Sequence, residues 1–183
     1  MKVIDCPLEG LKVVELDLHG DARGFFVERY SQQKFADAGL PTDFVQDNHS
    51  RSAPNVLRGL HYQANPAQGK MVGVTHGAVW DVAVDIRPDS VTYGQWHAVE
   101  LTGENGRLFW IPGGFAHGFC VLGDDPVDML YKVTGQYNKA GEGGILYDDP
   151  DLAVDWPLKN PIISDRDKGL ISFADYKKEP PKW

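Results

Sequence analysis

The sequence has few cysteines and no long apolar run, and both shortages narrow the class of protein. Cys6 and Cys120 are the only cysteines among 183 residues, too few for the disulfide framework of a small secreted domain. No segment approaches the roughly 20 apolar residues that span a bilayer. The opening stretch MKVIDCPLEG carries acidic side chains where a signal peptide needs an apolar run. These features predict a cytoplasmic protein with no membrane partner.

Basic residues are also scarce. The chain has 18 Lys and Arg against 26 Asp and Glu, which gives a net charge of −8. A nucleic-acid-binding protein usually presents a basic field, so no nucleic-acid partner is expected. A small anionic ligand is still possible, because a few Arg and Lys gathered in one cleft can oppose the overall charge locally.

The chain lacks linkers, low-complexity segments and internal repeats, so residues 1–183 are expected to form a single domain. Short runs of β-branched and aromatic residues recur between Gly, Pro, Asn and Asp. This rhythm is typical of an all-β antiparallel sandwich or barrel. The runs are FVQDNHS, VLRGLHYQ, KMVGVTH, AVWDVAVDIR, WHAVELT, RLFWIP, HGFCVL and DMLYKVT.

The two ends of the chain differ from its centre in their predicted secondary structure. Residues 2–20 predict one or two short strands, and residues 25–30 predict another. Ser31 is positioned to cap a short helix that stops at Gly39, and residues 164–168 predict one late helical turn. Residues from about 170 to 183, which end in KKEPPKW, are expected to be a loosely held tail.

Alternation in the run AVWDVAVDIR separates two faces of one strand. One face carries Val79, Asp81, Ala83, Asp85 and Arg87, and the other carries Trp80, Val82, Val84 and Ile86. Two interpretations stay open. The carboxylates can be solvated on a half-exposed strand, or they can line a polar cavity inside a barrel.

The stretch NVLRGLHYQ places Arg58 and His61 in an otherwise apolar strand. A buried charge is costly unless it is paired, so this placement suggests a binding cavity. Residues three apart point to opposite faces of a regular strand. If both side chains line the cavity, a bulge must intervene, and Gly59 is the natural place for it.

The metal-binding signal is weak. His61 and His117 both lie in strand-like runs and could ligate a metal, but no His-x-His pair is followed closely by Glu. His117 could equally be a structural residue satisfied by a hydrogen bond. The cations Arg23, Arg58 and Lys70 are better suited to phosphate, Arg through a bidentate fork and Lys as a point charge.

A series of polar and glycine-containing motifs runs from about residue 20 to residue 167. They are GDARGFFVE, VQDNHSRS, VLRGLHYQ, AQGKMV, DVAVDIRPDSVTYGQW, WIPGGFAHGF and LYKVTGQY. Together and in this order they resemble the signature blocks of the dTDP-4-dehydrorhamnose 3,5-epimerases. The resemblance implies a cupin-type jelly roll, a homodimer that exchanges an N-terminal strand, and no metal or other cofactor. It also implies inversion of C3 and C5 in a dTDP-linked 4-keto-6-deoxyhexose.

The resemblance assigns roles to individual residues. His61 matches the family's base and Asp167 its carboxylate partner, Lys70 the cation beside the sugar's C4 oxygen, and Tyr131 the acid on the far side of the ring. These residue types suit the chemistry, because epimerisation next to a ketone needs a base, a stabilised enolate and an acid. The substrate-binding positions implied are Arg23, Glu28, Gln46, Asp47, Asn48, Arg58, Lys70, His117, Tyr137, Glu142 and Arg166.

Three positions depart from the family's common pattern. Arg166 replaces a Lys, Gly73 an Arg and Gly113 a Glu, and these changes bear on the diphosphate contacts and the nucleotide preference. Two kinds of alternative function remain. One is a single-position epimerase or ketoisomerase acting on a related dTDP-4-keto-sugar, and the other is a metal-dependent cupin oxygenase or isomerase.

Overall fold

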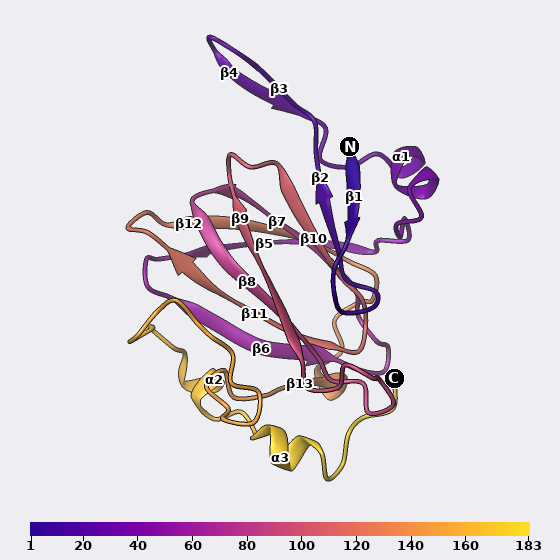
Figure 1. The fold of residues 1–183 in the computed structure, drawn as a ribbon, viewed down its shortest axis with the longest axis vertical. Helices are drawn as coiled ribbons and strands as arrows, with labels where there is room; N and C mark the ends of the chain where they lie inside the picture. Colours follow the sequence, from indigo (N-terminus) through magenta and orange to yellow (C-terminus); the bar gives the residue numbers. More distant parts are fainter.

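Two antiparallel β-sheets face each other in the computed structural model, which describes all residues from 1 to 183 (Figure 1). The six-stranded sheet has the order β1 (Lys2–Asp5), β2 (Lys12–Glu15), β10 (Arg107–Ile111), β7 (Lys70–His76), β12 (Val127–Val133) and β5 (Gln46–Ser52). The five-stranded sheet has the order β13 (Glu142–Gly144), β6 (Leu57–Gln63), β11 (Phe115–Leu122), β8 (Ala78–Asp85) and β9 (Trp96–Thr102). The predicted all-β sandwich is confirmed, and each predicted run contains a strand.

A separate hairpin of β3 (Leu18–Asp21) and β4 (Gly24–Val27) projects away from the sandwich (Figure 1). It pairs only with itself, and most of its residues are exposed. The predicted strand over 25–30 therefore ends early, at Val27, and the chain then turns towards the first helix. No helix of the structure is both long and apolar enough to cross a bilayer.

The helices are short, and three of them start at serine caps. α1 (Gln32–Asp37) is capped by Ser31, as the sequence predicted, and α2 (Asp165–Lys168), which forms the predicted late turn, is capped by Ser164. In each case the hydroxyl accepts a backbone N–H three residues on, which satisfies a donor that the helix leaves free. The remaining helical turns are η1 (Lys139–Gly141) and α3 (Phe173–Tyr176).

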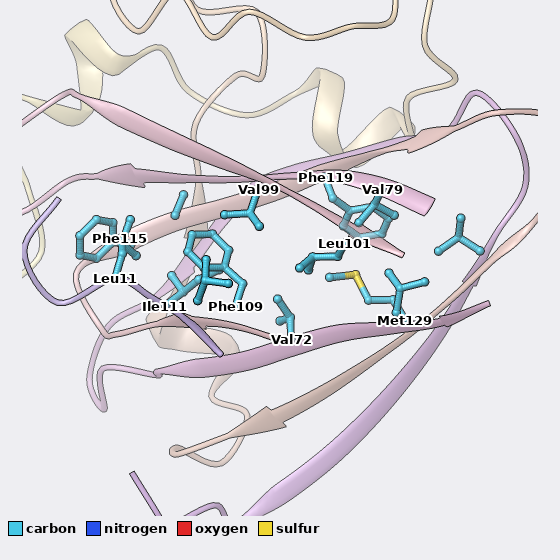
Figure 2. Packing of buried hydrophobic residues seen from close by; sticks show 14 of the residues in the cluster. Leu11, Val72, Val79, Val99, Leu101, Phe109, Ile111, Phe115, Phe119 and Met129 are labelled. Atoms are coloured by element: carbon cyan, nitrogen blue, oxygen red, sulfur yellow. The ribbon is translucent and has the colours of Figure 1, made fainter. Parts of the chain in front are cut away.

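The space between the sheets is filled at its centre by apolar side chains (Figure 2). Strand β8 contributes Val79 and Ala83 to this cluster, so the predicted alternation is confirmed. Asp81 and Asp85 share that inward face and are both fully buried, which excludes the solvated interpretation. Asp85 is satisfied locally by Arg87, whereas Asp81 faces the space between the sheets.

The other face of β8 is covered by the C-terminal segment. Val82, Val84 and Ile86 pack there against Phe173 and Tyr176, among others. Tyr176 is 1% exposed, and its hydroxyl donates to the Ile86 carbonyl at 2.7 Å. The segment from about residue 170 is thus not a loose tail throughout, because the apolar outer face of the sheet needs a cover. Only the residues after α3 are mainly exposed.

The bulge expected at Gly59 is present. His61 lies opposite His117 and Arg58 lies opposite Phe119, so three steps along β6 match two along β11. Gly59 has φ +121°, a conformation that L-residues rarely adopt. A Cβ atom there would lie 2.6 Å from Cα of Gly118. The extra residue lets Arg58 and His61 border one cleft.

Replacing Gly59 with Ala tests how far this bulge supports the fold. We expect Gly59→Ala to lower the free energy of unfolding by about 2–4 kcal/mol, because the strained φ and the backbone clash add together. Gly123→Ala is the matched control, since Gly123 also has positive φ (+74°) but nothing within 4 Å of its Cβ position. Urea unfolding measures both variants. Equal losses would show that φ alone matters.

Candidate active site

His61, Lys70 and Tyr131 converge from both sheets on one side of the apolar core. Tyr131 lies opposite Val72, and Val72 belongs to the inward cluster, so the phenol points between the sheets. His61 pairs with His117 on the facing sheet. The His117 ring meets the Tyr131 ring edge-on, with 6.4 Å between centroids. The predicted base and acid therefore lie on opposite walls of one polar region.

His61 is held by Asp167, as predicted. The distance from Nε2 to Oδ1 is 2.8 Å, and the Asp167 side chain is 5% exposed. The other carboxylate oxygen accepts the Gly59 N–H at 3.2 Å. Burial lowers the pKa of His61 below its usual value, although the bond to Asp167 opposes this. A neutral His61 whose Nε2–H donates to Asp167 keeps a free lone pair on Nδ1.

Lys70 lies in the same region, beside the buried carboxylate of Asp81. Burial lowers the pKa of Lys70 to about 8, while Asp81 and Glu142 act in the opposite direction. Both oxygens of Asp81 also lie within 3.0 Å of His117 Nε2. Sequence reasoning placed Asp81 on a candidate cavity face without giving it a role. The structure makes it the counter-charge of the site.

Tyr131 is held in its protonated form and so has a proton to give. Burial raises the pKa of Tyr131 to about 12, so the phenol is protonated at neutral pH, and a hydrogen bond with Ser50 acts in the opposite direction. The two hydroxyl oxygens are 3.1 Å apart. Nothing in the sequence singled out Ser50 beyond its place in the motif VQDNHSRS.

Arg58 differs from the expectation of a buried, paired charge. Its side chain is exposed, and its hydrogen bonds go to a hydroxyl and a backbone carbonyl rather than to a carboxylate. Nε donates to Ser52 at 3.0 Å, and Nη2 donates to the Arg51 carbonyl at 3.3 Å. The expectation that this charge is buried is therefore wrong. The exposed guanidinium, which has no carboxylate partner in the chain, is available to an anion.

A cleft opens from this region between β6 and the segment that leads into α2. It is lined by Val56, Leu57, Arg58, His61, Ile162, Ile163, Ser164, Arg166 and Asp167. The cleft combines apolar walls with two guanidinium groups and the candidate base. Such a mixture suits a sugar with an attached anionic group.

Tyr137, Glu142 and Arg166 form a linked group near the same region. Tyr137 donates its hydroxyl to Glu142 at 2.9 Å, and Arg166 contacts the other oxygen of Glu142 at 2.7 Å. Burial raises the pKa of Glu142, but the bonds from Arg166 and Tyr137 outweigh it and the net pKa is lowered. The Tyr137 ring is 58% exposed, so one face is open for stacking.

Gln46 and Asn48 lie on the inward side of β5, where Asn48 pairs with Tyr131 and a Gln46–Asn48 hydrogen bond of 2.7 Å links the two amides. Asp47 lies on the opposite side of the sheet and binds Lys132 at 2.9 Å. This outer face of the sheet points away from the space between the two sheets, where the candidate site lies.

Two more predicted binding residues also lie outside the cavity. Arg23 is at the exposed tip of the β3–β4 hairpin and binds Asp21. Glu28 follows β4 and pairs with Lys34 at 2.9 Å. The structure of the chain therefore brings together most of the predicted site but not Arg23, Glu28 or Asp47.

The two glycines that replace residues common in the family, Gly73 and Gly113, have local explanations. A Cβ atom at Gly73 would lie 2.6 Å from a guanidinium nitrogen of Arg29, so an Arg from another segment occupies that space. A Cβ atom at Gly113 would lie 2.8 Å from Cβ of Ala67, which leaves little room for Glu. No group of three or more His, Cys, Asp or Glu side chains is arranged to hold a metal ion.

The Lys70 amine provides a direct test of these electrostatics. Its pKa of about 8 predicts that the rate of amine acylation rises with pH through a midpoint near pH 8. Because the Asp81 carboxylate raises that pKa, Asp81→Asn should move the midpoint to lower pH. Peptide mass spectrometry after brief labelling across a pH series gives the titration. A midpoint that is unchanged or higher in Asp81→Asn would contradict the proposed coupling, and Asp124→Asn at an exposed turn is the control.

Comparison with known proteins identifies the family. The family model described as dTDP-4-dehydrorhamnose 3,5-epimerase matches residues 5–175. A protein of that name from Shigella flexneri is 49% identical over 96% of this chain and 97% of its own length. A dTDP-4-dehydrorhamnose 3-epimerase from Streptomyces niveus is 36% identical over 96% of this chain and 85% of its own.

A solved structure is also close to this one. It is a dTDP-6-deoxy-D-glucose-3,5-epimerase from Legionella pneumophila Philadelphia 1 in complex with dTDP-4-keto-L-rhamnose. It is 47% identical to this chain with a TM-score of 0.90, over 94% of this chain and 93% of that one. With the fold, the converging side chains and the sequence matches in agreement, the chain belongs to the dTDP-4-dehydrorhamnose 3,5-epimerase family.

Proposed function

We propose that this chain inverts C3 and C5 of dTDP-4-dehydro-6-deoxy-D-glucose and so produces dTDP-4-dehydro-L-rhamnose. The observation that carries the proposal is the convergence of His61, Lys70 and Tyr131 on one polar region between the sheets. A base and an acid on opposite walls are what inversion at carbon requires, because the proton must leave from one face and return to the other.

The chemistry follows from the protonation states of these groups. The C4 ketone acidifies the hydrogens on C3 and C5, and neutral His61 removes one of them. Negative charge then develops on the C4 oxygen, where the Lys70 ammonium stabilises it. Tyr131 returns a proton to the same carbon from the opposite face. Asp167 fixes the tautomer and the orientation of His61 and stabilises the imidazolium that forms.

The remaining polar groups are assigned to the nucleotide. Arg58 and Arg166 offer guanidinium groups beside the cleft for the diphosphate, and His117 contacts the sugar. Tyr137 stacks on thymine through its exposed ring, with Glu142 nearby to accept a hydrogen bond from the base. Gln46 and Asn48 supply amides from β5. Arg166 in place of Lys adds a fork that suits a planar partner.

The rest of the binding site is assigned to a second subunit. In a homodimer the β3–β4 hairpin would carry Arg23 and Glu28 to the partner's site, and Asp47 would lie towards the partner. Phe25 and Phe26 on this hairpin are 54% and 70% exposed, which is costly unless another surface covers them. One folded domain per subunit and a cytoplasmic location complete the proposal. Two free cysteines, one of them buried, suit a reducing compartment.

Deuterium incorporation tests the reaction. In D₂O, dTDP-4-dehydro-6-deoxy-D-glucose should gain label at both C3 and C5, because each inversion exchanges a carbon-bound proton with the enzyme. NMR of the product measures both positions. Label at one carbon only would instead establish a single-position epimerase. Loss of activity on chelation, restored by iron or zinc, would favour the metal-dependent alternative.

His61→Asn tests the assignment of His61 as the base. Turnover should fall by roughly 10²–10⁴-fold, the usual contribution of a general base. Binding of dTDP, measured by calorimetry, should stay close to that of the unmodified protein, because the nucleotide contacts lie elsewhere. Near-normal turnover in this variant would refute the assigned base.

The hairpin provides a test of assembly. Light scattering after gel filtration should give about twice the subunit mass of 20.3 kDa. The double substitution Phe25→Ser and Phe26→Ser should shift the protein towards monomer and raise KM, because it weakens the contact that delivers Arg23 and Glu28. Val91→Ser, at a 93% exposed site outside the hairpin, is the control. A monomeric but fully active parent protein would refute the exchange.

A further inference from the structure

Each inversion leaves the enzyme in the wrong protonation state for the next. When Tyr131 gives its proton to carbon, its O–H bond breaks, a C–H bond forms, and a phenolate remains. His61 meanwhile holds the proton taken from the substrate. That proton is on the far side of the ring, so it cannot return to Tyr131 while the sugar is bound. A reaction with two inversions per substrate therefore needs a separate proton route to Tyr131.

The structure contains one group suited to this route. Ser50 Oγ lies 3.1 Å from the Tyr131 hydroxyl, and this is the only hydrogen bond of that hydroxyl in the structure. Ser50 belongs to β5 and lies opposite Met129, an inward residue of the core cluster, so its side chain points to the same side of the sheet as Tyr131.

The surroundings of Ser50 connect it to solvent. β5 is the outermost strand of its sheet. Ser50 itself is only partly buried, and its neighbours His49 and Arg51 are exposed. Tyr131, on the neighbouring strand β12, is also partly buried, and it packs against the core cluster. The serine hydroxyl thus lies between the phenol and the open edge of the sheet.

We propose that Ser50 positions Tyr131 and relays its replacement proton. The Ser50 O–H donates to the phenolate while Ser50 Oγ accepts a proton from water at the sheet edge. His61 releases its proton to solvent through the cleft, so the two transfers restore neutral Tyr131 and neutral His61 with no net change. The same hydrogen bond stabilises the phenolate while it exists, which is consistent with the direction in which Ser50 shifts the Tyr131 pKa. This inference rests on the proposed role of Tyr131.

Ser50→Ala and Ser50→Thr test the relay together. Loss of the hydroxyl should lower kcat by about tenfold, within the range of a single proton-transfer contribution. It should also raise the solvent deuterium isotope effect on kcat, because reprotonation becomes rate-limiting. The affinity for dTDP should stay within about twofold. Ser50→Thr keeps the hydroxyl and should recover most of the lost turnover and the original isotope effect.

Ser52→Ala is the matched control on the same strand and side. Ser52 bonds Arg58 rather than Tyr131, so its loss should act on KM and leave the isotope effect unchanged. If Ser50→Ala keeps kcat within about twofold and an unchanged isotope effect, the relay is refuted. If both Ser50 variants lose turnover equally with an unchanged isotope effect, Ser50 serves packing only, and the relay is again refuted.

Failure of the underlying function would look different. Tyr131→Phe should show far lower turnover than Ser50→Ala. Full activity in Tyr131→Phe would refute the acid assignment, whatever Ser50 does. Absence of label at both C3 and C5 with the unmodified protein would refute the epimerase proposal itself.

Discussion

The carboxylate of Asp167 is the contact on which the arrangement of the site depends. One oxygen binds His61, and the other accepts the backbone N–H of Gly59. The backbone N–H of Asp167 donates to the hydroxyl of Ser164 at the start of α2. It therefore joins the candidate base, the bulge in β6 and the C-terminal segment. A buried carboxylate is costly without such partners, so the same bonds that orient His61 also make the burial of Asp167 tolerable.

Opposed charges are distributed so that each candidate group has a usable protonation state near neutral pH. Burial alone would drive Lys70 towards its neutral form, and Asp81 opposes this from a fully buried position. His61 is kept neutral by burial despite its carboxylate partner. Tyr131 is kept protonated by burial. The cavity thus presents a proton acceptor, a cation and a proton donor together, and the proposed reaction uses these three groups.

Much of this was predictable from sequence, and the failures have physical causes. Alternation in β8, the Ser31 cap and the bulge at Gly59 are local properties, and the structure confirms all three. Arg58 was expected to be buried because its strand is apolar, but its side chain is exposed. The pattern of one strand does not specify which of its positions other segments cover. Ser50 could not be identified, because its importance comes from a contact with Tyr131, 81 residues away. The cover supplied by Tyr176 likewise depends on a distant strand.

The position of α2 and α3 after every strand of the sandwich has a consequence for folding during synthesis. Residues 165–176 leave the ribosome after both sheets, so the growing chain can form the sheets before it has the partner of His61 or the cover for the outer face of β8. Val82 and Val84 would then be exposed to water, and the bulge at Gly59 would lack its hydrogen bond to Asp167. Completion of the candidate site therefore waits for residues 165–176, and a chain that stops before them would leave an apolar surface exposed to aggregation.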